Sequence, residues 1–370
     1  MVKLKLYMKS TVKKSFISRR ATLKILGISS AALFTGTLGD ITTATPSKTK
    51  KSRSLYVPDV RSRVSFTTGT DRVRMISEVM KPFEQQIRKG LKGKQLIIKP
   101  NMVLTYVPLC ATHVDALRGV LEFVKPFYHE QIIIAEASGD KGNSAPGFKN
   151  YGYLDLQKEY DLRFIDLNLS TGSPVWILNR NLHPEKIFVT DMFLDPHNYI
   201  ISVSRLKTHN SVVMTAGTKN IVMAAPLNIP AVNGNQQINY KSKMHGGGPR
   251  WLNYNMALLA QSIRPDFTVI DGVEGMEGNG PSAGTAVDHR IALAGEDVLA
   301  VDSICAKLMN IPVENIGYLN FCAAQGLGNI DYKSIDILGD KDPENFVRTY
   351  ALAPNIKRQL EWKEDFIPVK

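Results

Sequence analysis

The stretch Gln95-Leu-Ile-Ile-Lys-Pro-Asn101 reads as a short apolar strand that runs directly into polar residues. Three later stretches have the same form: Ile132-Ile-Ile-Ala-Glu136 before Ala137-Ser-Gly-Asp140, Ile200-Ile-Ser-Val-Ser204 before Arg205-Leu-Lys-Thr-His-Asn210, and Thr268-Val-Ile-Asp271 before a glycine-bearing segment that ends at Pro281. Apolar residues that do not alternate with polar ones are typical of strands buried on both faces of a sheet. In open α/β sheets ligands bind beyond the carboxyl ends of the strands, so we expect the four polar segments to converge on one crevice.

Stretches of helical periodicity separate these and other short strands. We expect strands at residues 95–99, 131–136, 163–166, 199–204, 267–271, 290–294 and 334–338, and helices at 71–89, 113–128, 251–263, 297–309 and 318–325. The alternation predicts an α/β fold with a largely parallel or mixed sheet that helices cover on both faces. Residues 64–345 are enough for one large α/β domain or two lobes, and we expect residues 346–370 to form a C-terminal extension.

The formal net charge of +12 is concentrated at the N-terminal end of the chain. Residues 1–63 hold fourteen Lys and Arg against two acidic residues, whereas the remaining 307 residues hold 32 basic and 32 acidic side chains. Affinity for nucleic acids depends chiefly on cationic contacts with phosphates. The neutral body therefore predicts no nucleic-acid binding.

Residues 1–45 have the layout of a signal peptide: a basic stretch to Lys24, an apolar run at 25–39, and small residues to Thr45. Within it, Ser18-Arg-Arg-Ala-Thr-Leu-Lys24 resembles the twin-arginine motif, with Thr22 where Phe is usual. The resemblance implies export by the twin-arginine translocation machinery to a periplasmic or other extracytoplasmic location. The alternative is a disordered basic tail on a cytosolic protein. The run is too short and polar to span about 30 Å of hydrocarbon, so we expect no permanent membrane span. A basic linker is expected at 46–63.

The three cysteines, Cys110, Cys305 and Cys322, lie in apolar sequence without a C-x-x-C spacing. A cluster held by four thiolates cannot be built from three cysteines, so we expect no intrinsic iron–sulfur cluster. Buried structural thiols are the expected role.

Several short motifs follow one another in an order that resembles one family. They are Lys99-Pro-Asn101, Thr112-His113, Lys207-Thr-His209, Thr218-Lys-Asn220, Asp271-Gly272 with Met276-Glu-Gly-Asn-Gly-Pro281, and Leu293-Ala-Gly-Glu-Asp297 with Ala300-Val-Asp302. Together they resemble the domain of unknown function 362 family (DUF362). The resemblance implies a unit the size of a domain and a set of candidate residues, but it implies no particular reaction.

Four titratable residues are candidate catalytic groups. Lys207 and His209 lie two residues apart just past a predicted strand, so an ammonium and a neutral imidazole can meet the same anionic ligand. His113 is expected near a helix N-terminus, which disfavours its protonation and leaves it available as a base. Glu136 ends a buried strand, where a carboxylate requires a partner, and Lys99 or Lys207 is the expected one. The alternative role of His209 is that of a hydrogen-bonded packing residue, and helix capping by Thr112 alone would explain the Thr112-His113 motif.

Candidate ligand-binding groups lie on the same segments. Those expected to hold an anionic ligand or cofactor are Lys99, Asn101, Lys219, Asn220, Gly278 and Gly280. A divalent metal is the candidate cofactor, with Asp271, Glu277 and His209 as ligands. The alternatives are a helix cap at residues 219–220 and a glycine-rich turn with solvated acids. We expect Asp302, within a predicted helix, to form a structural bond to a nearby loop.

Two functions are consistent with such a crevice. In the first, the protein is an enzyme that acts on a small anionic substrate with a metal or organic cofactor, and His209 and Lys207 serve as acid/base and charge clamp. In the second, the same segments bind a ligand or metal without catalysis. The number of titratable groups of both signs favours the enzyme. No H-E-x-x-H motif occurs, which argues against zinc proteases of that type.

Overall fold

The structure is a computed structural model that describes residues 61–140, 142–229 and 236–364. All of these residues belong to one structural unit of the chain. The predicted signal peptide at 1–45 and nearly all of the predicted linker at 46–63 lie outside the described residues.

Nine strands of the described residues form one mixed sheet, in the order β13-β1-β12-β11-β7-β2-β3-β4, with β8 paired to β7. Their bounds are β1 (Ser62–Thr68), β2 (Gln95–Lys99), β3 (Ile132–Glu136), β4 (Leu162–Asp166), β7 (Asn198–His209), β8 (Val213–Thr215), β11 (Phe267–Asn279), β12 (Ala283–Gly295) and β13 (Ile335–Leu338). Strands β11, β7, β2, β3 and β4 run parallel to one another, whereas β12 is antiparallel to both of its neighbours. Two small antiparallel pairs are β5 (Gly172–Leu178) with β6 (Pro184–Thr190), and β9 (Asn228–Ile229) with β10 (Ile238–Asn239).

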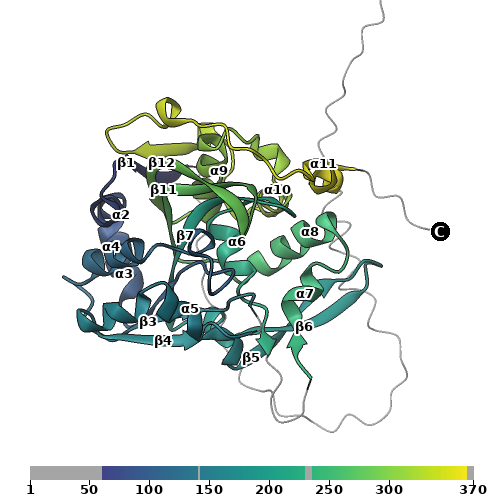
Figure 1. Ribbon diagram of the computed structural model, residues 1–370, viewed down its shortest axis with the longest axis horizontal. Coiled ribbons are helices and arrows are strands. Elements are labelled where there is room, and N and C mark those ends of the chain that lie inside the picture. The colour runs from purple at the N-terminus through teal and green to yellow at the C-terminus, as the bar shows by residue number, and fades with distance from the viewer. Residues whose placement is uncertain (1–60, 141, 230–235, 365–370) are drawn as a thin grey trace, which may run out of the picture. The chain divides into compact units, whose positions relative to one another are not determined.

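Helices cover both faces of this sheet (Figure 1). One group, drawn at the left of Figure 1, comprises α2 (Arg72–Met80), α3 (Glu84–Leu91) and α4 (Val114–Val124). The opposite group comprises α6 (Gly217–Val222), α8 (Pro249–Ala260), α9 (Val298–Leu308) and α10 (Gly317–Ala324), and the shorter helices are α5 (Ala145–Asn150), α7 (Tyr240–Met244) and α11 (Ile356–Gln359). Successive side chains of β2 enter different cores, because Ile97 packs with residues of α8 and α9 and Ile98 with residues of α2 and α4. The predicted α/β fold is confirmed.

Two central strands are longer than predicted. The polar residues after Ser204 continue β7 to His209, because residues 207–209 pair with β8. Likewise the glycine-rich residues after Asp271 continue β11 to Asn279, because they form a hairpin with β12. Hydrogen bonding to neighbouring strands therefore extends β7 and β11 into residues whose local sequence predicted loops. Gly272 is required there, since an added Cβ would lie 2.6 Å from a side-chain carbon of Ile291.

The predicted helix at residues 71–89 is interrupted. A 3₁₀ turn at Lys81–Phe83 separates α2 from α3. Pro82 lies in this turn, and proline has no N–H with which to continue a helical ladder.

Residues 346–364, the described part of the predicted C-terminal extension at 346–370, pack against the α/β body. Tyr350 is buried and its hydroxyl is hydrogen-bonded to His289. The Oε1 atom of buried Gln359 accepts a hydrogen bond of 2.6 Å from the backbone N–H of Val213 at the start of β8. These contacts tie the C-terminal segment to the strand that extends β7.

Candidate functional site

A pocket of about 340 Å³ lies at the carboxyl ends of β2, β3 and β7. Asn101 follows β2, Glu136 ends β3 and His209 ends β7, and all three line the pocket. Lys219 and Asn220 enter its wall from α6. The turn between β11 and β12 contributes Pro281, so all four of the polar segments noted in the sequence reach one place.

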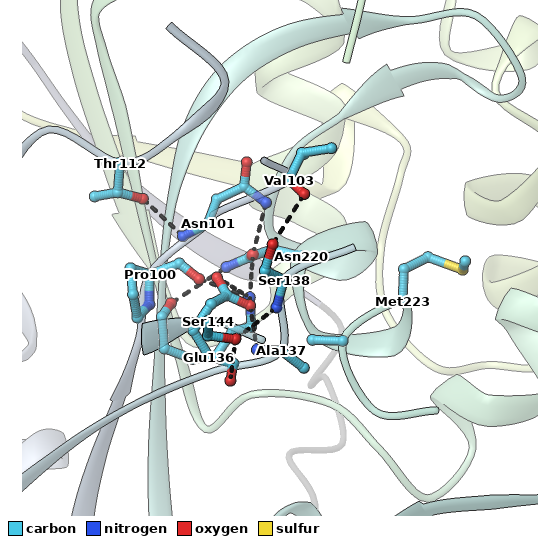
Figure 2. A network of polar contacts seen from close by, with 12 residues as sticks. Pro100, Asn101, Val103, Thr112, Glu136, Ala137, Ser138, Ser144, Asn220 and Met223 are labelled. Atoms are coloured by element: carbon cyan, nitrogen blue, oxygen red, sulfur yellow. Dashed lines mark hydrogen bonds and ion pairs between the residues drawn. The ribbon is translucent and has the colours of Figure 1, made fainter. Parts of the chain in front are cut away.

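A buried ion pair forms the floor of the site. The Nζ atom of Lys99 donates hydrogen bonds to Glu136 Oε2 (2.8 Å), Asn220 Oδ1 (2.8 Å) and the carbonyl of Pro100 (2.6 Å). Figure 2 shows the side chains of Asn101, Glu136 and Asn220 together in this network. Burial lowers the pKa of Lys99 and raises the pKa of Glu136, and their mutual attraction opposes both shifts. The predicted partner of Glu136 is thus confirmed as Lys99.

Lys207 contacts a residue of the pocket wall but does not line the pocket itself. Its Nζ donates to Asn101 Oδ1 and to the carbonyl of Cys110 (2.9 Å), and Lys207 is not among the residues that line the pocket. Asn101 Nδ2 in turn donates to Asn220 Oδ1 (3.0 Å). Burial lowers the pKa of Lys207 to about 7, and nearby cations including Lys219 add to the effect. Lys207 therefore orients Asn101, and the structure does not place it as the charge clamp that the sequence suggested.

Two further lysine amines reach the pocket wall. Lys219 is 9% exposed, and its Nζ forms no hydrogen bond or ion pair with any described residue. Burial, with a contribution from the charge of Lys99, lowers the pKa of Lys219 to about 8. The half-buried Lys241 donates to the carbonyls of Met223 (3.3 Å) and Ala224 (3.0 Å), and burial lowers its pKa to about 7. Sequence reasoning missed Lys241, because no strand end or motif marks its segment.

His209 presents a neutral imidazole to the pocket. Its Nδ1 accepts a hydrogen bond of 2.9 Å from the backbone N–H of Ser211, so the ring proton of the neutral form is on Nε2. Burial is the main cause that lowers the pKa of His209 far below its usual value, and the charges of Lys219 and Lys207 contribute. A second lining residue, Thr215, has a buried hydroxyl without a hydrogen-bond partner.

The predicted metal ligands are not assembled. Asp271 Oδ1 accepts from Arg72 Nε (3.0 Å), and Glu277 Oε2 accepts from the backbone N–H of Ala351 (2.8 Å). Both residues belong to the extended β11, where these bonds hold them away from His209 in the pocket. Across residues 61–364, as far as they are described, no three His, Cys, Asp or Glu side chains form a group that could hold a metal ion. A pocket lined by lysines also does not suit a divalent cation, so no metal chemistry is assigned to it.

Two predicted backbone donors are already engaged. Gly278 N–H donates to the carbonyl of Ala351 (2.7 Å), and Gly280 N–H donates to the carbonyl of Gly278 (2.9 Å). Neither glycine lines the pocket, which corrects the prediction that they bind an anion there. Their carbonyls join the hairpin to β7, because Thr208 Oγ1 donates to Gly278 O (3.0 Å) and Asn210 N to Gly280 O (2.9 Å).

His113 serves as a helix cap. It is the N-cap residue of α4, and its Nδ1 accepts a hydrogen bond of 3.1 Å from the backbone N–H of Asp115. Burial and the nearby charge of Arg72 lower the pKa of His113. It does not line the pocket, so it has a capping role in place of the predicted catalytic one. Thr112, which the sequence suggested as the cap, instead donates to the carbonyl of Val203 (2.7 Å).

Asp302 fixes the start of the helix that carries Lys219. Its carboxylate oxygens accept hydrogen bonds from the backbone N–H groups of Gly217 (2.7 Å) and Thr218 (2.9 Å). The expected structural bond is therefore present, and it is made to the N-terminus of α6. Burial raises the pKa of Asp302 to about 7.

Among the described residues, no helix has both the length and the apolar character needed to cross a membrane. The three cysteines are buried and free, as expected.

The chain is similar in part to known proteins. The chain is 23% identical over 229 residues to the thylakoid-associated protein sll1697 of Synechocystis sp., a match that covers 59% of this chain and 64% of that protein, less than two thirds of its length. A crystal structure of a Thermotoga maritima protein is similar at a TM-score of 0.40 and 13% identity, over 62% of this chain and 57% of that one. The model of the family described as domain of unknown function (DUF362) matches residues 96–307, more than half of the chain. The chain therefore belongs to the DUF362 family.

Proposed function

We propose that this protein is an exported enzyme that acts on a small anionic substrate, bound in the pocket at the ends of β2, β3 and β7. The observation that carries the proposal is the imbalance of charge in the pocket wall. Among the described residues that line it, Lys99, Lys219 and Lys241 are cationic groups, and Glu136 is the sole carboxylate. Since Glu136 is committed to Lys99, two amines are left to attract an anion.

Polar groups without hydrogen-bond partners also support an anionic ligand in this pocket. Buried polar atoms in folded proteins nearly always have a hydrogen-bond partner. In this pocket, the buried hydroxyl of Thr215 has none, and the amine of Lys219 donates to none of the described residues. A carboxylate or phosphate would accept hydrogen bonds from both.

Catalysis is favoured by the protonation behaviour of the lining groups. The pKa values of Lys219 (about 8) and Lys241 (about 7) lie close to neutral pH, where a side chain can both accept and release a proton. Such shifts are concentrated at functional sites. His209 adds a neutral imidazole with its Nε2 proton. Simple recognition of an anion would need fewer titratable groups.

Export rests on the N-terminal sequence, which lies outside the described residues. Arg19 and Arg20 directly precede the long apolar run of residues 25–39, as in twin-arginine leaders. We propose that the twin-arginine translocation machinery exports the folded protein.

Binding can be tested by measuring the midpoint of thermal unfolding of the full chain with and without phosphate, citrate, pyruvate or 2-oxoglutarate. A ligand at one hundred times its Kd should add about 2.7 kcal/mol to the free energy of unfolding. The shift should be lost in Lys219→Met and Lys241→Met and kept in Lys333→Ala, a control at an exposed lysine. It should also be larger at pH 6 than at pH 9, because deprotonation of the amines weakens their attraction for an anion. Equal shifts in all four proteins would overturn the proposed site.

Turnover is the second measurement. Protein purified from its exported compartment should be examined by native mass spectrometry for a retained ligand, and that compound should then be supplied in excess. Consumption of the compound by the wild type, and its loss in His209→Ala, would support an enzyme. Saturable binding without consumption would favour the alternative, an extracytoplasmic ligand-binding protein.

A further inference from the structure

The four buried or half-buried lysines around the pocket have very different hydrogen bonding. Lys99 donates three hydrogen bonds, Lys207 two and Lys241 two. Lys219 donates none to any described residue, although it is 9% exposed and lines the pocket. An amine that no neighbour holds is free to react, whereas the other three are bound as structural or electrostatic groups.

The surroundings of Lys219 also match the requirements of a nucleophilic amine. Such an amine must be neutral to attack, and burial beside other cations favours the neutral form. With a pKa of about 8, the neutral fraction of Lys219 at pH 7.5 exceeds that of an ordinary lysine at 10.5 by roughly two orders of magnitude. The neighbouring Lys241 amine uses two of its three N–H donors on backbone carbonyls, which leaves one to pair with an acid group of the same ligand.

We infer that Lys219 forms a Schiff base with the carbonyl carbon of a small 2-oxo acid. This inference rests on the proposed function and names its substrate class. The Nζ lone pair attacks the carbonyl carbon to give a carbinolamine, and the C–O bond then breaks. The two hydrogens of the amine leave with the carbonyl oxygen as water, so the products are an imine and one water molecule, with no oxidant or reductant.

His209 is placed to carry the proton in this step. Its Nε2–H belongs to a neutral ring that faces the pocket, and it lies close enough to Lys219 for the amine's charge to contribute to its lowered pKa. The ring can donate to the departing oxygen and recover the proton from the nitrogen. The acid group of the ligand would meet Lys241 and the hydroxyl of Thr215.

Reductive trapping tests the inference. The full chain is incubated with pyruvate and sodium cyanoborohydride at pH 7.5, digested and mapped by mass spectrometry. The expected product is Lys219 heavier by the mass of pyruvic acid less one oxygen atom, labelled at least about tenfold more than exposed Lys333, because the lowered pKa of Lys219 raises its neutral fraction. Lactate, which has the same charge and no carbonyl, should protect Lys219. Dihydroxyacetone, which has the carbonyl and no charge, should label it poorly.

Variants separate the possible outcomes. Lys219→Arg keeps a cation but cannot form the imine, so it should retain the thermal shift with pyruvate and lose the adduct. His209→Gln should slow labelling without changing its position. Labelling spread evenly over surface lysines, or anion binding without any adduct, would overturn the Schiff base and leave the proposed function standing. No thermal shift and no adduct with any 2-oxo acid would count against both.

Discussion

Replacing Lys219 by Met should stabilise the unliganded protein, which is unusual for a change in a buried position. The side chain has no hydrogen bond to lose, and Met fills a similar volume without an amine. The fall in pKa from 10.5 to about 8 measures how much the fold disfavours the charged form. At about 1.4 kcal/mol per pH unit, this corresponds to about 3 kcal/mol at pH 7.

The gain should depend on pH in a defined direction. Below about pH 8, Lys219 is protonated in both the folded and the unfolded chain, and the full cost of the buried charge is present. Between about pH 8 and 10.5, the unfolded chain binds more protons than the folded chain, so the free energy of unfolding of the wild type rises with pH. The advantage of Lys219→Met should therefore be complete below pH 8 and absent above pH 10.5.

Lys207→Met is the matched control, because the same substitution is made at a lysine that is also buried and also has a lowered pKa. Lys207, however, donates to Asn101 Oδ1 and to the carbonyl of Cys110. Its loss leaves two buried acceptors unpaired, at about 1–3 kcal/mol each. This cost offsets the gain from removing a buried charge, so Lys207→Met should be less stable than Lys219→Met at pH 7.

The assay is thermal unfolding of both variants and the wild type at pH 7 and pH 10.5, without added anions. In domains of 150–250 residues, 1 kcal/mol moves the midpoint by about 2–4 °C, so Lys219→Met should raise it by several degrees at pH 7. If Lys219→Met lowered the midpoint at pH 7, or did not exceed the midpoint of Lys207→Met, Lys219 would have a partner in the folded protein and the reasoning would be refuted.

Three further outcomes are expected. Glu136→Gln leaves Lys99 without its counter-charge and should reduce the free energy of unfolding by about 3 kcal/mol or more, measured by denaturant titration; a change below about 0.5 kcal/mol would mean that the pair is not buried. Asp302→Ala leaves two backbone N–H groups at the start of α6 unpaired, so it should cost about 1–3 kcal/mol and weaken anion binding, measured by calorimetry. Replacing Arg19 and Arg20 together by Lys should abolish export of a folded reporter fused to residues 1–45, and unchanged export would exclude a twin-arginine leader.

The sequence predicts the strands of the sheet centre well, because buried parallel strands leave a strong local signal. Continuous apolar runs gave the bounds of β2 and nearly those of β3 and β4. The prediction fails where pairing with a distant strand decides the structure. Nothing local in residues 272–279 shows that β12 will pair with them. β1 was likewise missed, since it begins at Ser62 in a stretch whose charge suggests a linker.

The sequence predicts where the candidate site lies better than it predicts the role of each residue in it. The strand-end rule brings Asn101, Glu136 and His209 to one pocket. Lys207 was expected to face the same ligand as His209, two residues on, but its amine is held by Asn101 and the Cys110 carbonyl. Which of several lysines stays unbonded depends on acceptors that come from other segments, so it can be read only from the folded structure.

The short helix α6 explains why that lysine is Lys219. Gly217 lets the helix start against β11 and α9, since an added Cβ would lie 2.4 Å from the methyl carbon of Thr268 and 2.9 Å from a methyl carbon of Val298. Asp302 holds the first turn, and Asn220 bonds to both Lys99 and Asn101. The bonds of Asp302 to its start and of Asn220 to the polar floor fix the orientation of the helix. Lys219 then lies one position before Asn220, over the pocket and beyond the acceptors of that network. The hydrogen bonds of Asp302 and Asn220 therefore also determine that the amine left for a ligand is that of Lys219.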